Sequence, residues 1–557
     1  MSSSPATKAG NSKGRPPHPS GEVFLYTPGV PRTDAVRIGM VYPAPYAVAM
    51  SSLGYLMLFK QLDENPLAAV RRINSETYAQ YRNPDAELLG YSFSFELDIF
   101  EILNSFAQLG LPARAADRAD DAPLVFAGGP TVMSNPEPYA DFFDFFVVGE
   151  GEEVLQELVS AYHDVRHLKN RADRLRALAA QVKGVYAPSL YDVSYDSPEG
   201  AVTAITPRFD DVPAVVGKRW LENPDAFISS TPILTEDTVF ANSFLVEVMR
   251  GCAHRCRFCL ASYSMLPARG PTVGGLMATL EAGLQHTRKV GLLGALVSEH
   301  PDFPALCEYL RQQENIRIST SSLRADGLTA DIVATLKHGG QQQVTLAVET
   351  GSDRLKRRIN KNLKNEEVLA AADTVAAGGL QGLKLYGMVG LPDETESDVA
   401  ALADLVKQIR GANKALKLSL TVSSFVPKGG TPFQWQAKVD NATVKHRQTM
   451  LHKALLKVAD VRPTSPKWDY VQALLARGDR RLGPLIERFV ALGHSLGSLH
   501  RADKALRAEG CRYPSLDWYT LRERPEAEVL PWDLIDLGVP KAILYKEGLP
   551  PPGFENL

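Results

Sequence analysis

The chain has 557 residues, too many for one hydrophobic core, and this length predicts two to four domains. Hydrophobic residues make up 45% and charged residues 22%, as in globular proteins, and the formal net charge is -3. This near-balance excludes a nucleic-acid signature carried by the whole chain, although it leaves room for a local basic patch. No stretch has the roughly 18 uncharged apolar residues that a membrane span requires.

The N-terminal residues are rich in Ser, Pro, Gly and Lys and have no apolar run. A signal peptide would need an apolar core of about 7–15 residues, so a disordered tail is predicted over 1–30.

Strands and helices alternate over 31–160, which predicts a parallel sheet covered by helices on both faces. The predicted strands are 35–43, 86–95, 123–130 and 143–151, and the predicted helices are 51–64, 97–110 and 152–162. Glycines follow two of these strands, at the sheet edge where open α/β sheets bind ligands. They are Gly128, Gly129, Gly149 and Gly151.

A charged helix and a Pro-, Asp- and Ser-rich stretch predict a linker over 161–238. A second alternating series then fills 239–450. Its six βα units predict a partial (βα)6 barrel with its chemistry at the carboxyl ends of the strands. The predicted strands are 243–251, 289–298, 316–326, 342–351, 383–392 and 416–427. Residues 451–557 are predicted to form a mostly helical, charged C-terminal region.

Three of the five cysteines, Cys252, Cys256 and Cys259, follow the first strand of this second series. A disulfide framework does not fit this pattern, whereas a metal site in a reducing cytoplasm does. Thiolates at this spacing can hold three irons of a [4Fe–4S] cluster and leave the fourth iron open. The alternative is zinc with His254 as a fourth ligand, but zinc ligands normally come as two separated pairs.

The Cys-x3-Cys-x-Phe-Cys loop after a first barrel strand resembles the radical S-adenosylmethionine (radical SAM) superfamily. The resemblance implies that the three cysteines bind a [4Fe–4S] cluster and that Phe258 lies beside the adenine of S-adenosylmethionine. It further implies reductive cleavage of S-adenosylmethionine to a 5′-deoxyadenosyl radical. The electron would come from a donor such as a flavodoxin or ferredoxin.

The resemblance also implies further cofactor-binding residues on the later strands. Ser298 is the candidate for the methionine amino group, although the family's usual Gly-Gly-Glu is absent there. Arg324 could bind the carboxylate, and Glu349 and Ser352 could meet the ribose hydroxyls or the ammonium group. Met388 takes the position under the adenine. For Arg324 an ordinary ion pair is the alternative, and for Met388 plain core packing.

Over about residues 35–545, the chain is similar to one branch of this superfamily. Members of that branch have an N-terminal cobalamin-binding-like domain of Rossmann-like fold. None of the eleven histidines lies between 36 and 157, so this domain offers no imidazole to cobalt. Cobalamin could still bind at the four glycines through free backbone N–H groups. Alternatively, these glycines serve tight turns and the domain shapes a substrate pocket.

The sequence therefore predicts a cytoplasmic radical SAM enzyme that activates a C–H bond, with cobalamin-dependent C-methylation of an unknown substrate as one outcome. One rival is an RNA-modifying enzyme that grips RNA through the basic stretches 354–362 and 476–483. Another is a non-catalytic iron–sulfur or zinc protein that senses redox state.

Overall fold

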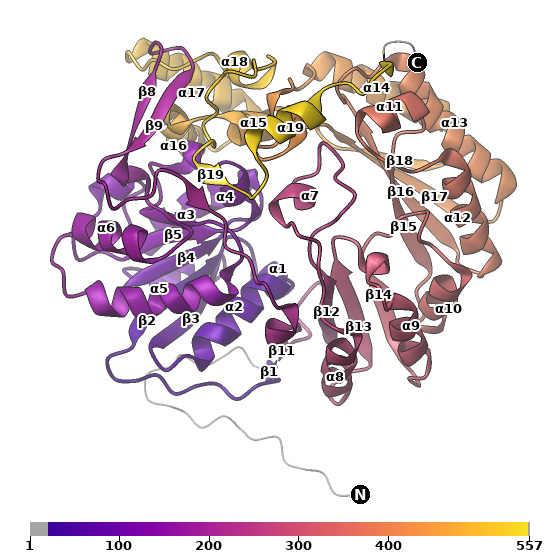
Figure 1. Cartoon of the computed structure of the whole chain (residues 1–557), viewed down its shortest axis with the longest axis horizontal. Helices are drawn as coiled ribbons and strands as arrows, with labels where there is room; N and C mark the ends of the chain where they lie inside the picture. The colour runs from indigo at the N-terminus through magenta and orange to yellow at the C-terminus, as the bar shows by residue number, and fades with distance from the viewer. Residues whose placement is uncertain (1–20, 555–557) are drawn as a thin grey trace, which may run out of the picture.

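The computed structural model describes residues 21–554, and these form two α/β units side by side (Figure 1). The predicted disordered tail lies mostly outside the described residues. Its last part was wrongly assigned, because Val23–Phe24 (β1) pairs antiparallel with Ile233–Leu234 (β11). No helix within 21–554 has the length and apolar character needed to cross a membrane.

The N-terminal unit is a six-stranded sheet in the order β3-β2-β4-β5-β6-β7, with only β7 antiparallel to its neighbour. The strands are β2 (Val36–Tyr42), β3 (Ala68–Asn74), β4 (Leu88–Ser92), β5 (Leu124–Gly128), β6 (Phe145–Val147) and β7 (Val185–Tyr186). The strand order reverses between β2 and β4. In open α/β sheets the ligand crevice lies outside the carboxyl ends at such a switch point.

Helices cover both faces of this sheet, because each helix has an apolar side that packs on the strands and a polar side that faces away from them. They are α2 (Leu53–Glu64), α3 (Ile99–Leu109), α5 (Gly151–Val165) and α6 (Arg171–Gln181). Helix α6 and strand β7 belong to this unit, although the sequence predicted a linker from residue 161. The remainder of that stretch holds a hairpin of β8 (Tyr191–Tyr195) and β9 (Val202–Pro207).

The second unit is the predicted parallel barrel, split into the sheets β12-β13-β14 and β15-β16-β17-β18. A bridge between Leu323 and Leu346 links the two sheets. The strands are β12 (Ser243–Met249), β13 (Lys289–Gly294), β14 (Arg317–Thr320), β15 (Gln343–Glu349), β16 (Gly382–Val389), β17 (Lys417–Ser424) and β18 (Asp460–Pro463). The prediction of six strands was one short, because β18 lies in the stretch expected to be helical and pairs parallel with β17.

The barrel helices pack their apolar sides on the outer face of these strands and bury one continuous core. They are α8 (Val273–Leu284), α9 (Phe303–Arg311), α10 (Ala330–His338), α12 (Asn365–Ala377), α13 (Glu396–Ala412) and α14 (Asn441–Ala454).

The C-terminal helices return to the N-terminal unit (Figure 1). Helices α15 (Pro466–Arg477), α16 (Gly483–Ala491) and α17 (Leu496–Ala508) contribute apolar side chains to the same core as the N-terminal sheet. The following segment pairs β19 (Ile535–Asp536) with β10 (Val216–Gly217) and ends in α19 (Lys541–Gly548).

The carboxyl-end loops of the two units face each other. After β4, Glu96 accepts a hydrogen bond from Lys428, which follows β17. After β5, the Ser134 hydroxyl donates to the Gly429 carbonyl at 3.2 Å. Leu53 of α2 packs with Leu245 of β12. The N-terminal unit therefore closes over the same edge of the barrel that carries the cysteine loop.

Candidate functional site

The three cysteines lie on a loop that leaves the carboxyl end of β12. The loop begins at Gly251, whose φ of +76° suits glycine, and a Cβ there would lie only 2.3 Å from the Met265 carbonyl oxygen. Cys256 is buried, whereas Cys252 and Cys259 are half-buried. The fold thus confirms the predicted position of the cysteine loop at the catalytic edge of a parallel barrel.

The residues that directly follow α11 (Asp353–Arg358) hold the backbone of the cysteine loop. The Arg257 amide donates to the Ile359 carbonyl at 3.0 Å. The Asn360 side chain donates to the carbonyls of His254 and Arg255 at 3.1 and 2.9 Å. These bonds satisfy peptide groups of a segment that has no regular secondary structure.

Helix α19 covers the cysteine loop from the C-terminal end of the chain. Its Glu547 accepts a 2.9 Å hydrogen bond from Tyr263 and pairs with Arg255 at 2.7 Å. The Arg358 guanidinium donates to the Gly548 carbonyl at 2.8 Å. The C-terminal segment is therefore part of the site, which the helical pattern of 451–557 could not indicate.

The chemistry of the cysteines suits an iron–sulfur cluster. Burial raises the pKa of Cys256 to about 12, against the opposing effect of Lys361. A bound cation would compensate the charge of such a thiolate, since coordinating thiols lose their proton outright. Within residues 21–554, no group of three His, Cys, Asp or Glu side chains could hold one metal ion. Cluster thiolates each bind a different iron and need not converge in that way.

The zinc alternative required His254 as a fourth ligand. Its Nε2 atom instead lies 3.4 Å from Oε1 of Glu299. The donor set of the loop is therefore three thiols, and it fits three irons of a cluster better than one zinc ion.

A cavity of about 530 Å³ reaches the loop at Cys252. Its wall includes Leu296 and Glu299, which flank Ser298 in the turn after β13. The Ser298 hydroxyl is buried and has no hydrogen-bond partner among the described residues. Because buried polar groups are normally paired, this hydroxyl fits the predicted bond to a bound polar group.

Phe258 and Met388 share a set of apolar neighbours although 130 positions separate them in the chain. Both pack, half-buried, against one apolar cluster. The members of that cluster are Leu355, Ile359, Leu391, Phe425 and Phe433. Both side chains thus have an apolar environment, and their contact with adenine stays a prediction.

Glu349 and Lys361 form a buried pair, with Nζ and Oε1 3.4 Å apart. Glu349 ends β15 with a φ of +62°, an uncommon conformation for a residue with a side chain. Such backbone positions persist where the surroundings enforce them, often at functional sites. The carboxylate therefore stays a candidate for the predicted contact with S-adenosylmethionine.

Arg324 and Ser352 bond to their own chain. The Arg324 guanidinium makes two bonds to Asp326, at 2.9 and 2.7 Å, and a third to the Asn362 carbonyl. The Ser352 hydroxyl caps α11 (Asp353–Arg358) and donates to Asp398 at 2.5 Å. The alternative interpretation of Arg324 as an ion pair thus describes its contacts. The Ser352 hydroxyl caps a helix, and its role toward S-adenosylmethionine stays a prediction.

The four glycines of the N-terminal unit differ in how much space surrounds their Cα atoms. A Cβ on Gly129 would lie 2.6 Å from the Phe93 oxygen, and one on Gly149 would lie 2.1 Å from the Arg219 oxygen. At Gly151 it would lie 2.9 Å from the Leu58 side chain. Only Gly128 keeps ordinary spacing. The tight-turn interpretation accounts for these three glycines, and cobalamin binding by the four stays a prediction.

An ion-pair network joins the N-terminal unit to the first residue after β12, and the sequence analysis missed it. Arg250 pairs with Glu150 at 2.9 Å, Glu152 at 2.7 Å and Glu247 at 2.6 Å. Arg269 also pairs with Glu150, at 2.5 Å. Burial opposes charge on Glu150, but the two arginines hold its pKa below the usual range. Nothing in the local sequence pattern indicates a contact across a hundred residues.

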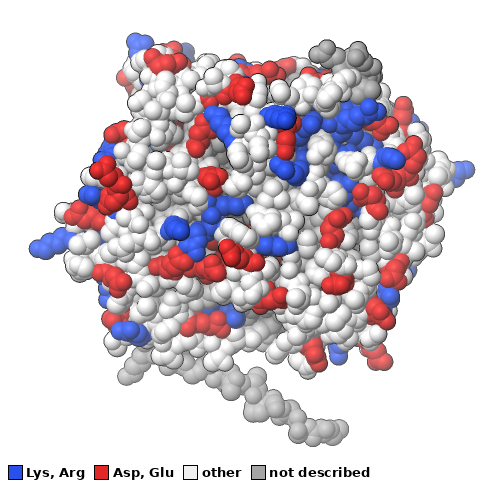
Figure 2. All heavy atoms as spheres, viewed as in Figure 1, with Lys and Arg blue, Asp and Glu red and all other residues white. Residues whose placement is uncertain are grey.

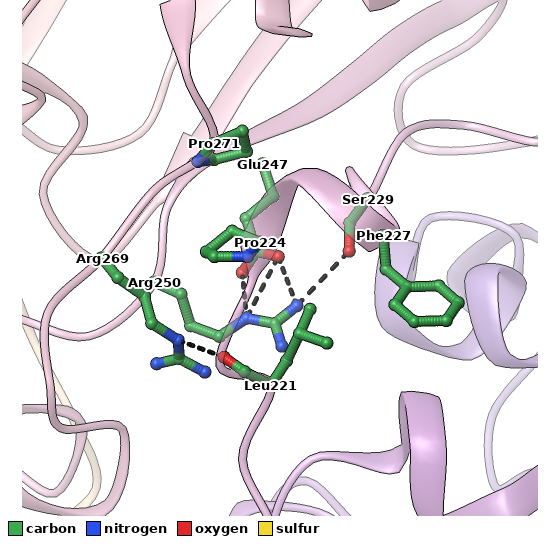
Figure 3. Close-up of a pocket in the computed structure, with 8 residues that line it drawn as sticks. All are labelled: Leu221, Pro224, Phe227, Ser229, Glu247, Arg250, Arg269 and Pro271. Carbon is green, nitrogen blue, oxygen red and sulfur yellow. Dashed lines mark hydrogen bonds and ion pairs between the residues drawn. The ribbon is translucent and has the colours of Figure 1, made fainter.

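Figure 3 shows the part of this network that lies on the barrel side. Arg250 reaches Glu247 and, at 3.4 Å, the hydroxyl of Ser229, while Arg269 donates to the Leu221 carbonyl at 2.7 Å. The pocket between these side chains has only about 10 Å³ of free volume. It is a packed interface and has no room for a ligand.

The basic stretches at 354–362 and 476–483 bond largely within the chain. Arg354 pairs with Asp398, and Arg358 with Asp393 at 2.6 Å. In the second stretch, Arg477 donates to carbonyls, Arg480 pairs with Glu137 and Arg481 pairs with Asp479. The second stretch is therefore an internal network, and it offers no free arginines to RNA phosphates.

Two family descriptions match this chain. Residues 67–188 match "Radical SAM proteins, N-terminal", and residues 246–406 match "Radical SAM superfamily". The second match contains the cysteine loop, Ser298, Glu349 and Met388.

Curated relatives extend the match. The uncharacterized protein MJ0966 of Methanocaldococcus jannaschii is 29% identical over 81% of this chain and 90% of its own length. The uncharacterized methyltransferase PH0819 of Pyrococcus horikoshii is 26% identical, over 53% of this chain and 60% of its own. A tRNA-2-methylthio-N(6)-dimethylallyladenosine synthase of Frankia casuarinae is 25% identical, over 38% and 40%.

Among solved structures, the cobalamin-dependent S-adenosylmethionine radical enzyme OxsB with aqua-cobalamin bound aligns over 86% of this chain and 76% of its own. The TM-score is 0.48 and the sequence identity is 14%.

Proposed function

Because the chain belongs to the radical SAM superfamily, we propose that it activates a C–H bond of its substrate with a radical derived from S-adenosylmethionine. A [4Fe–4S] cluster, when bound, supplies the electron that cleaves S-adenosylmethionine to methionine and a 5′-deoxyadenosyl radical. Cys252, Cys256 and Cys259 would hold three of its irons. The observation that carries the proposal is their position on one loop at the carboxyl edge of the barrel, where a cavity reaches Cys252.

The chain's own residues would bind and orient the cosubstrate. The unpaired Ser298 hydroxyl would accept a hydrogen bond from the methionine ammonium group. Phe258 and Met388 would exclude water from the adenine, and Glu349, held by Lys361, would accept bonds from hydroxyl or ammonium groups. Arg324 would act as a support for the loop at Asn362 and not as a direct ligand.

Anaerobic reconstitution tests this proposal. The chain should take up about four irons and release 5′-deoxyadenosine when reduced with dithionite. Cys256→Ala should abolish nucleoside release, whereas Cys511→Ala, at a cysteine outside the loop, should retain it. Equal release from both variants would overturn the proposal.

We further propose that the reaction is a methyl transfer that uses cobalamin, which the arrangement of the two units favours. The carboxyl-end loops of the N-terminal sheet face the barrel edge through Glu96–Lys428 and Ser134–Gly429, so a corrinoid at the β2–β4 switch point would lie between the units. The name of the Pyrococcus horikoshii relative supports methyl transfer. The absence of histidine between 36 and 157 restricts the proposal to a corrinoid without an imidazole ligand from this domain.

Purification with cobalamin supplied in excess tests the methyl-transfer version. A bound corrinoid seen in the optical spectrum supports it, and a chain that takes up no corrinoid contradicts it. An RNA substrate is the second candidate, and it has support from the names of tRNA-modifying relatives. Retained activity on a short tRNA fragment, with a steep salt dependence, would favour RNA.

Two further parts of the proposal concern the setting of the enzyme. We place it in the cytoplasm, because all five cysteines are free, as a reducing compartment requires. We also propose an outside one-electron donor such as a flavodoxin or ferredoxin.

A further inference from the structure

Basic side chains gather on the outer surface beside the cysteine loop. Figure 2 shows lysine and arginine concentrated over α11 and the end of α19. We call this surface the basic face. Its residues come from the cysteine loop, α11 and α19, and they are Arg255, Arg257, Arg354, Arg357 and Lys546. Arg358 of α11 is buried and is not part of this surface.

Part of this positive charge is neutralised and part is not. Glu547 pairs with Arg255, and Asp398 pairs with Arg354. Arg357 and Lys546 are exposed, and no carboxylate among residues 21–554 forms an ion pair with either. These two side chains give the face its fully exposed positive charge.

Arg257 adds a third cation that no carboxylate within the described part of the chain pairs. Its guanidinium donates to the carbonyl oxygens of Arg358 at 2.6 Å and Arg357 at 3.2 Å. These contacts place the Arg257 guanidinium against the backbone of α11, so its charge adds to that of Arg357 and would attract an anionic partner.

The basic face lies directly against the cluster ligands. Arg255 and Arg257 flank Cys256 in the chain, and Asn360 ties α11 to the same loop. The cavity that reaches the loop has a different lining, at Cys252 and Ala253. None of the five residues of the basic face lines it. The loop therefore has one face toward the cavity and another toward the basic face.

We propose that the basic face docks an acidic one-electron carrier protein, with its flavin or iron–sulfur group next to the cysteine loop. This inference rests on the proposed function. The carrier would be oxidised by one electron, and that electron would reduce the cluster held by Cys252, Cys256 and Cys259. Transient electron-transfer complexes have small interfaces, so a compact face of this kind is sufficient. Opposite charges steer such partners together.

Charge reversal of the two exposed cations tests the docking surface. With the reconstituted chain and a flavodoxin as the probe, Arg357→Glu combined with Lys546→Glu should weaken binding at least about tenfold at low salt. The difference should shrink above about 0.2 M salt, because screening shortens the reach of the charges. The control combines Arg501→Glu with Lys504→Glu on α17, which makes the same charge change on exposed residues elsewhere.

Two reductants separate docking from chemistry. Nucleoside release driven by reduced flavodoxin should fall with the binding loss, whereas release driven by dithionite should match the unchanged chain. Absence of dithionite-driven release from the unchanged chain would defeat the proposed function itself. Two outcomes would overturn only the docking surface, provided that nucleoside release with dithionite is normal. In one, neither flavodoxin nor ferredoxin binds the chain. In the other, both double variants bind the carrier equally well. Binding of tRNA in place of the carriers, lost in R357E/K546E, would overturn it in favour of RNA.

Discussion

Oε2 of Glu150, at the start of α5, lies 2.9 Å from Nη1 of Arg250, the residue after β12 and two before Cys252. Both side chains are largely buried, so this pair ties the N-terminal unit to the beginning of the cysteine loop. Arg250 keeps Glu152 and Glu247 when Glu150 is removed, but Glu150 is the only carboxylate among residues 21–554 that pairs with the buried Arg269. Removing one partner of a buried ion pair leaves an uncompensated charge and is usually costly.

Glu150→Ala should therefore destabilise the protein by about 3–5 kcal/mol and reduce the iron retained after reconstitution. Thermal unfolding and iron analysis measure the two effects. Glu157→Ala is the matched control, because Glu157 pairs with Arg219 at 2.6 Å but is about half exposed. It should cost at most about 1 kcal/mol. Equal losses in both variants would show that the Glu150–Arg250 pair has no special role.

Gly251→Ala should disrupt the start of the cysteine loop. The substitution places a Cβ 2.3 Å from the Met265 carbonyl oxygen, at a φ of +76°. We expect a cost of about 1–3 kcal/mol and a lower iron content, measured by unfolding and iron analysis. Gly274→Ala in α8 meets no atom within 4 Å and should be neutral or slightly stabilising. A fully loaded Gly251→Ala variant would contradict the geometry described here.

Ser298→Ala should weaken S-adenosylmethionine binding about tenfold without lowering the melting temperature. The hydroxyl has no partner among the described residues, so its removal leaves no group of the protein unpaired. Equilibrium binding to the reconstituted chain measures the effect. Ser321→Ala is the comparison, since its hydroxyl already donates to the Gly294 carbonyl at 3.1 Å. Unchanged binding in Ser298→Ala would remove this residue from the site.

Asp98→Asn should stabilise the protein above about pH 6. Burial raises the pKa of Asp98 to about 6, although the backbone amides of Phe95 and Ser94 oppose the shift. Because the folded pKa exceeds the unfolded value, the wild-type chain loses stability as pH rises from about 4 to 6. The asparagine variant does not titrate. The difference should be near zero at pH 4 and reach about 1–3 kcal/mol at pH 8.

Chemical unfolding at several pH values between 4 and 8 measures this difference. Asp85→Asn is the control, because Asp85 is exposed and pairs with Arg37 only at the surface. A pH-independent difference between Asp98→Asn and the wild-type chain would refute the raised pKa.

Much of the fold could be predicted from periodicity. Alternating apolar segments predicted a parallel sheet and a barrel, because buried parallel strands need continuous apolar runs. The short strand β18 has too few residues to show such a pattern, and only its pairing with β17 reveals it. Likewise, the apolar faces of α15, α16 and α17 are legible in the sequence, but their packing against the N-terminal sheet is not.

The site shows the same division. Cys252, Cys256, Cys259 and Phe258 could be predicted because their spacing lies within one loop. The contacts predicted for Arg324 and Ser352 with S-adenosylmethionine stay predictions, and the structure adds Asp326 and Asp398 as partners that the sequence did not indicate. A side chain's chemistry does not specify which neighbour satisfies it.

The sequence by itself determined the order of strands and helices and the thiol loop, since both depend on residues a few positions apart. Only the tertiary structure decided that Glu547, Asn360 and Glu150 hold that loop and that α11 meets the end of α19 beside it. Those contacts join residues tens to hundreds of positions apart. Their energies depend on burial and distance, which exist only after the chain has folded.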